Sequence, residues 1–169
     1  GNGSRLVPFH HGERVGKPKP GPDGMATTTW RLDRPHPIYL LNVAIGPFEV
    51  TRHPHPRTRL ETWSLPQDKA RVAAQYQALP AMLDFFESTL GVRYPFKSYR
   101  QVVVHAFPFG GMENVTLTTL TSRSLRLDAR ALLDGDASGL LAHELAHQWF
   151  GDWVTARTWG DIWLHEGFA

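Results

Sequence analysis

The sequence predicts an α+β fold, in which a β-rich stretch to about residue 56 precedes a mixed sheet with helices. Runs rich in β-branched and aromatic residues dominate the first part of the chain. A helical period runs from about residue 65 to 90, and a second one surrounds residues 140–150. Between these helices, "RQVVVHAF" (100–107) has the composition of a buried strand.

The first elements alternate between turns and strands. "KPKPGPDG" (17–24) predicts a turn or loop, because proline and glycine interrupt regular structure. "MATTTWRL" (25–32) and "PIYLLNVAIGPFEV" (37–50) predict strands. "RHPHPR" (52–57) predicts a loop, and "RTRLETWS" (57–64) predicts a further strand.

A long helix follows these strands. Ser64 and Gln67 resemble a capping box at its start. The helix is expected to run to Leu90, to be kinked or divided at Pro80, and to end at Gly91.

Two strands are predicted after that helix. His105, within the buried strand 100–107, is expected to pack in the core rather than bind a ligand. "ENVTLTTLTS" (113–122) alternates polar and apolar residues and predicts a strand near a sheet edge.

The segment His143-Glu144-Leu145-Ala146-His147 has the spacing of a metal site. Residues four apart share one helix face, so both imidazoles can bind one zinc ion. Glu144 lies about 100° around the helix from His143, which suits a general base beside the metal rather than a ligand. The alternative is a chance arrangement, which the composition predicts in about 2% of such chains.

A catalytic zinc also needs a third protein ligand and one open position. Glu166, nineteen residues after His147, is the candidate. The first helix can be capped by Asp136 or Ser138 and ended by Gly151. A second helix is expected to start with Asp161 as its N-cap and to turn Glu166 towards the first.

Composition excludes several classes of function. The 169 residues suffice for one domain or parts of two, and 41% are hydrophobic. A net charge of +2 without a long basic run argues against nucleic-acid binding. The absence of cysteine excludes disulfides and thiolate metal sites.

These residues include neither a signal peptide nor an apolar run long enough to span a membrane. We expect the chain to be cut at both ends, because it lacks an initiator methionine and stops three residues after Glu166. Localisation therefore stays open between a cytoplasmic protein and a secreted or periplasmic one.

Two motifs resemble those of a known family. "HELAHQWFGDWVTARTWGDIWLHEGFA" (143–169) is similar to the gluzincin zinc aminopeptidases of the aminopeptidase N family. "GGMENVTLTTL" (110–120) resembles the exopeptidase signature of the same family. The resemblance implies that residues 1–56 end an all-β N-terminal domain. It also implies that residues 57–169 form the first half of a thermolysin-like catalytic domain, truncated at 169.

The resemblance implies a Zn²⁺ cofactor, a general base and peptide substrates with a free N-terminus. Its ligands would be His143, His147 and Glu166, and Glu144 would be the base for a zinc-activated water. Glu113 would anchor the substrate amine, although by itself it could be an ordinary exposed carboxylate. The substrate-binding residues implied by the motif are Gly110, Gly111, Met112, Glu113 and Asn114.

One departure and two alternatives remain. His165 stands where the family usually has asparagine. We expect its side chain to face solvent or to contact a metal ligand without binding the metal itself. "FPFGGMEN" also resembles the leukotriene A4 hydrolase branch, which opens an epoxide. A zinc-binding homologue without activity is the other alternative, because the family's downstream tyrosine would lie beyond Ala169.

Overall fold

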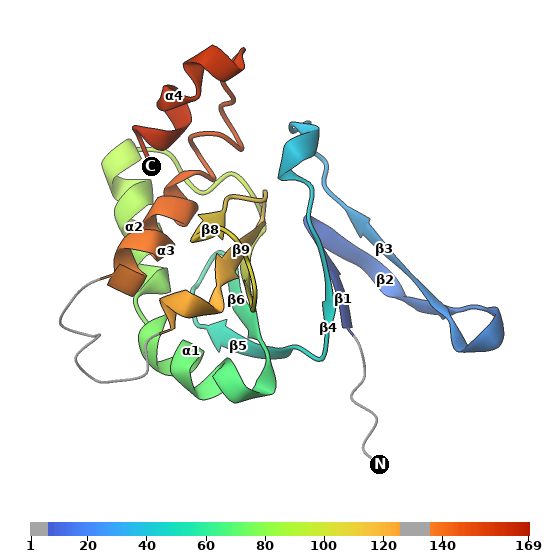
Figure 1. Cartoon of the computed structure of the whole chain (residues 1–169). Coiled ribbons are helices and arrows are strands. Elements are labelled where there is room, and N and C mark those ends of the chain that lie inside the picture. Colours follow the sequence, from blue (N-terminus) through green and yellow to red (C-terminus); the bar gives the residue numbers. More distant parts are fainter. Residues whose placement is uncertain (1–6, 126–135) are drawn as a thin grey trace.

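The structure is a computed structural model that describes residues 7–125 and 136–169. Two β-ribbons from the N-terminal part lie on one side of a five-stranded sheet, and helices lie on the other (Figure 1). The α+β class is therefore confirmed. None of the helices in the described ranges has the length and hydrophobicity needed to cross a membrane.

Strands dominate the first two thirds of the chain, and helices flank them. The strands are β1 (Val7–His10), β2 (Glu13–Pro20), β3 (Ala26–Arg31), β4 (Val43–Gly46), β5 (Glu49–His53), β6 (Arg59–Ser64), β7 (Ser98–Val104), β8 (Gly111–Met112) and β9 (Leu117–Thr121). The α-helices are α1 (Lys69–Gln75), α2 (Leu79–Leu90), α3 (Asp136–Ala146) and α4 (Trp163–Glu166). The 3-10 helices are η1 (Pro22–Gly24), η2 (Ile38–Leu40), η3 (Pro66–Asp68), η4 (Ser122–Ser124) and η6 (Trp159–Asp161).

The main sheet is mixed. Its strand order is β5-β6-β7-β9-β8, with β6, β7 and β9 parallel and the two outer strands antiparallel to their neighbours. The ribbons pair β1 with β4 and β2 with β3. The pairing of β5 with β6 crosses residue 56, where the sequence places a domain boundary. That boundary stays a prediction.

Side chains of β7 are buried on both faces of the sheet. Tyr99 packs with Leu83 of α2 and with Leu145 of α3. Val102 points to the opposite face and packs near Trp30 of β3. A strand covered on both sides by other layers is typical of parallel sheet interiors. This packing fixes α3, which carries the two histidines, against the centre of the sheet.

The N-terminal strands differ from the sequence prediction at their prolines. The expected strand 25–32 is confirmed as β3, and 57–64 contains β6. The expected loop 17–24 is wrong at its start, because β2 continues to Pro20. A proline is tolerated there, since β2 is an edge strand of a two-stranded ribbon. The single strand expected over 37–50 is wrong, because η2, β4 and β5 divide it.

The long helix also begins and breaks differently. Ser64 is the last residue of β6, and neither η3 nor α1 has a side-chain cap, so the capping box is wrong. The helix divides between Gln75 and Leu79 rather than at Pro80. Pro80 lies in the first turn of α2, where its missing N–H costs nothing. Gly91 ends α2 in the left-handed conformation, as predicted.

The two later strands are confirmed as β7 and β9, with bounds that differ from those expected. β9 lies within the expected strand 113–122 and is near the sheet edge as predicted, because it pairs with the edge strand β8. His105 is not a core residue: it follows the end of β7, and 48% of its side chain is exposed. Its Nε2 lies 2.7 Å from Asp68 Oδ2. A charged partner at the strand end therefore replaces the expected apolar packing.

Leu83 offers a test of the packing behind the site. Replacing this fully buried residue with alanine is expected to lower the free energy of unfolding by about 2–5 kcal/mol, because it leaves a cavity between α2 and the sheet. Urea denaturation measures the change. Phe85→Ala on the same helix, where the side chain is exposed, is the control. Equal losses for both variants would contradict this packing.

Candidate metal centre

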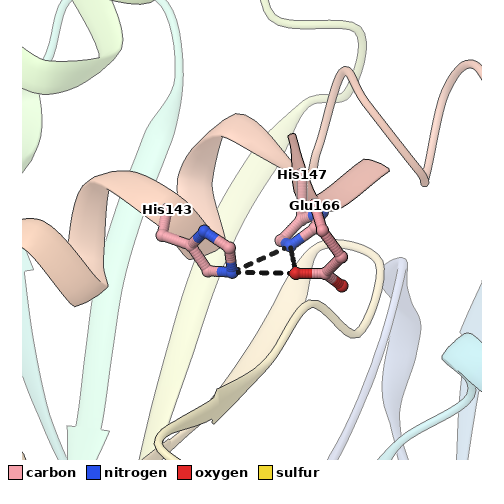
Figure 2. A group of neighbouring side chains, drawn as sticks. All are labelled: His143, His147 and Glu166. Carbon is pink, nitrogen blue, oxygen red and sulfur yellow. Dashed lines mark hydrogen bonds and ion pairs between the residues drawn. The ribbon is translucent and has the colours of Figure 1, made fainter. Parts of the chain in front are cut away.

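Three ligand atoms converge from two helices. His143 and His147 project from α3 and its end, and Glu166 projects from α4 (Figure 2). The two Nε2 atoms lie 3.1 Å apart. Oε2 of Glu166 lies 3.5 Å from Nε2 of His143 and 3.7 Å from Nε2 of His147. The three residues predicted as ligands are thus brought together.

The imidazole of His147 is oriented by the backbone. Its Nδ1 lies 3.0 Å from the carbonyl oxygen of Phe150, so Nδ1 donates and carries the proton of the neutral ring. This leaves the Nε2 lone pair directed at the other two ligand atoms. The ring is 1% exposed, and burial lowers its pKa below the usual value. A neutral imidazole is the form that binds a metal.

These separations fit a tetrahedral zinc ion. Bonds of about 2.0–2.1 Å imply ligand atoms about 3.3 Å apart. The observed separations of 3.1, 3.5 and 3.7 Å lie around that value. Two imidazoles and one carboxylate are also the ligand set typical of catalytic zinc sites, which keep a fourth position open. The residues present therefore fit zinc.

The segment between the ligands turns back on itself. α3 ends at Ala146, and Phe150 forms an isolated bridge with Val154. Gly151 follows with φ +128°, a conformation that favours glycine. The expected helix end at Gly151 is therefore wrong, because α3 ends at Ala146 and hydrogen-bonded turns follow it. The expected caps at the start of α3 lie outside the described side chains, except Ser138, which is inside the helix.

The second helix starts later than predicted. Asp161 ends η6 and accepts a hydrogen bond from Thr158 at 2.8 Å, so its expected role as N-cap is wrong. The residue before α4 is Ile162, which provides no side-chain cap. Glu166 nevertheless lies in α4 and faces α3, as predicted.

Glu144 lies beside the three ligands in a buried position. It is 3% exposed, and Oε2 has no hydrogen-bond partner among the described residues. Burial, followed by repulsion from Glu113 and Glu166, raises its pKa to about 8. A Cβ at Gly111 would collide with its carboxylate, so the missing side chain at Gly111 gives Glu144 its place.

The motif 110–114 forms the sheet edge beside this carboxylate. Gly111 and Met112 make up β8, and the Gly110 carbonyl accepts a hydrogen bond from Thr121 N–H at 2.9 Å. Glu113 is 8% exposed, so the alternative of an ordinary exposed carboxylate is wrong. Its charge is close enough to raise the pKa of Glu144.

Asn114 holds the turn rather than opening towards the site. Its Nδ2 donates to the carbonyl oxygens of Leu40 and Leu41 at 3.4 and 3.5 Å. Its Oδ1 accepts from Thr119 Oγ1 at 2.8 Å. The side-chain amide is therefore engaged within the protein, and it fixes Glu113 next to η2.

The part of the chain that carries the metal centre matches a known protein family. The profile of the peptidase family M1 domain matches residues 74–169, which is more than half of the chain. The chain belongs to peptidase family M1. The match includes β7 to β9 and both ligand-bearing helices.

M1 relatives extend the similarity towards the N-terminus. The chain is 36% identical to aminopeptidase N of Haemonchus contortus over 135 residues, or 78% of this chain. It is 34% identical to aminopeptidase Ey of Gallus gallus over 155 residues, and 33% identical to endoplasmic reticulum aminopeptidase 1 of Homo sapiens over 135 residues. These matches cover 87% and 78% of this chain. The matched region is only 14–16% of the length of these three relatives.

His165 has a supporting position in this M1 chain. It is 2% exposed, so the expectation that it could face solvent is wrong. Its Nε2 accepts a hydrogen bond from Ala156 N–H at 2.8 Å, so its proton lies on Nδ1. It lies outside the group of three ligands. It ties the returning segment to α4, directly before Glu166.

Three residues near the M1 site were missed from the sequence. Gln148 lies two residues after the end of α3 and is fully buried. Asp152 is 3% exposed, and burial, followed by repulsion from Glu113 and Glu144, raises its pKa well above the usual value. Burial, Glu113, Asp152 and Glu166 raise the pKa of Tyr39 to about 12. A polar residue directly after His147 was a usable signal for Gln148. Nothing local connects Tyr39 to a site about a hundred residues later.

Proposed function

We propose that the protein is a zinc-dependent aminopeptidase that removes the N-terminal residue from peptides. One observation carries this proposal: His143, His147 and Glu166 converge within 4.8 Å, with the buried Glu144 beside them. The names of the M1 relatives support aminopeptidase chemistry, but the chain spans about one sixth of their length or less.

The roles of the chain's own groups follow from their positions. His143, His147 and Glu166 would hold the zinc, which when bound acts as a Lewis acid towards water and towards the developing oxyanion. Glu144 would accept a proton from the attacking water and pass it to the leaving amine. A neighbouring cation favours the ionised form of this carboxylate and so offsets the effect of burial on its pKa.

Selection for a free N-terminus would come from the turn after β8. Glu113 is a buried carboxylate near Glu144, and its charge suits the α-ammonium of a substrate. β8 is the edge of the sheet, where an extended peptide can add as a further strand. Together they would set which peptide bond reaches the metal.

We also propose that residues 57–169 form the first half of a thermolysin-like catalytic domain, and that residues 1–56 end an all-β domain. The two ribbons pair within themselves, which supports a separate unit. β5 is the exception, because it joins the main sheet.

The function is tested with the full-length enzyme and matched peptides. We expect the free-amine peptide to be cleaved much faster than its N-acetylated form, and a zinc chelator to abolish cleavage. Equal cleavage of both peptides would contradict an aminopeptidase. Turnover of an epoxide substrate without peptide cleavage would favour the leukotriene A4 hydrolase alternative, and zinc binding without turnover of either would favour an inactive homologue.

Replacing Glu113 with alanine tests the amine anchor. Loss of a charge-assisted contact in a buried site is expected to lower kcat/KM on the free-amine peptide by about 10²–10³-fold, with little change for the acetylated peptide. The ratio of the two kcat/KM values measures this effect. Glu49→Ala, which removes a carboxylate from an exposed pair with Lys69, is the matched control. A Glu113→Ala enzyme that discriminates as strongly as wild type would exclude the anchor role.

A further inference from the structure

Gln148 joins the metal helix to the turn that carries Glu113. It directly follows the ligand His147 and is fully buried. Its Nε2 donates to the carbonyl oxygen of Glu113 at 3.2 Å. Its Oε1 accepts from Thr116 N–H at 2.9 Å and from the Tyr94 hydroxyl at 3.3 Å. One side chain therefore binds both ends of the turn 113–116.

The turn depends on such external bonds because its backbone is strained. Thr116 has φ +59°, which non-glycine residues rarely adopt. A conformation of this kind persists only where the surroundings over-determine it. Besides the bond to Gln148, Thr116 accepts a hydrogen bond from Gly12 N–H at Oγ1 and one from Arg100 N–H at its carbonyl.

The chemistry of the side chain matches this position. The side-chain amide offers a donor to one carbonyl and an acceptor to one N–H from a single group. These bonds hold the buried amide in one orientation, since losing either of them leaves a polar group unsatisfied.

We propose that Gln148 is a positioning residue, which fixes the distance between the amine anchor Glu113 and the metal ligand His147. This inference rests on the proposed aminopeptidase function. The link is short: one peptide bond connects His147 to Gln148, and one hydrogen bond connects Gln148 to the backbone of Glu113. A displacement of the anchor relative to the reacting centre by about 1 Å can cost about 10²-fold in rate.

The test replaces Gln148 with methionine in the full-length enzyme. Methionine keeps the length of the side chain but neither donates nor accepts as the amide does. We expect kcat/KM on a free-amine peptide to fall by about 10–100-fold. The ratio of kcat/KM for the free-amine peptide to kcat/KM for the N-acetylated peptide should fall by a similar factor. The zinc content should stay at one per chain. Gln101→Met, at another fully buried glutamine bonded to Thr62 and Tyr99, is the matched control and should keep the wild-type ratio.

A double-mutant cycle distinguishes a loss of activity that acts through Glu113 from one that is independent of Glu113. If Gln148 acts through Glu113, then Gln148→Met in the Glu113→Ala background should change kcat/KM by less than about threefold. Full additivity of the two losses, or an unchanged ratio in Gln148→Met with zinc retained, would overturn the inference. Equal cleavage of both peptides by wild type would instead overturn the proposed function.

A measurement on the wild type keeps the inference testable if the variant does not fold. The Thr116 amide hydrogen is bonded to the buried Oε1 of Gln148, so its exchange with solvent should be strongly protected. Rapid exchange at Thr116, alongside slow exchange in neighbouring β9, would show that Gln148 does not hold the turn.

Discussion

Replacing Glu144 with glutamine is expected to leave zinc bound and to lower kcat by about 10²–10⁴-fold, the usual contribution of a general base. Glutamine keeps the size of the side chain but cannot accept the proton of the attacking water. The native carboxylate performs that task in its ionised form, which a bound cation would favour against the effect of burial on its pKa. Glu144 is not one of the three grouped ligand residues, so the metal content should stay unchanged.

Two measurements decide this prediction. Metal analysis of the purified variant should give the wild-type zinc content, and steady-state kinetics should place the loss in kcat rather than KM. Glu61→Gln is the control, since Glu61 is also buried, at 8% exposure, but lies in β6. Near-normal kcat in Glu144→Gln would exclude the general-base role whatever its zinc content.

Replacing His147 with alanine is expected to lower zinc affinity by more than about a hundredfold. Losing a residue that only hydrogen-bonds to a ligand already costs up to about a hundredfold, and His147 would bind the metal directly. Three ligands become two, and the carbonyl of Phe150 loses the donor that oriented the ring. Activity should fall in proportion to the zinc lost. Titration with a competing chelator measures the affinity directly.

The matched control for this variant is His53→Ala. His53 is buried like His147, but it lies in β5 and contacts Thr62 at 2.9 Å. Its loss should reduce stability without releasing zinc. A His147→Ala enzyme with stoichiometric zinc and normal activity would refute the ligand assignment.

The sequence was most informative where the chemistry dictates spacing. Two histidines four residues apart lie on one face of a helix and can there bind one metal, and the distance to Glu166 required a return of the chain. Both expectations agree with the converging ligand atoms. The sheet strands β6, β7 and β9 were also predictable, from the buried-strand composition of residues 100–107 and the alternation in residues 57–64 and 113–122.

The errors fall where tertiary contacts override local preference. Pro20 was expected in a loop, but it is the last residue of the edge strand β2. Ser64 was expected to cap a helix, but it is the last residue of β6. His105 was expected in the core, but β7 ends at Val104 and the imidazole of His105 hydrogen-bonds to the carboxylate of Asp68. Gln148 and Tyr39 owe their importance to partners far away in the chain, which local pattern cannot specify.

The origin of the three ligand atoms in two separate segments has a thermodynamic consequence. His143 and His147 lie in α3 and directly after it, whereas Glu166 lies in α4. The ligand atoms therefore converge only while the two segments are held together, and separating the segments has a free energy of local opening. A ligand that binds only the closed arrangement raises that free energy by RT ln(1 + [L]/Kd). With the proposed zinc bound, metal occupancy and the association of α3 with α4 would thereby be linked, and the ion would act as a cross-link between two segments of the chain.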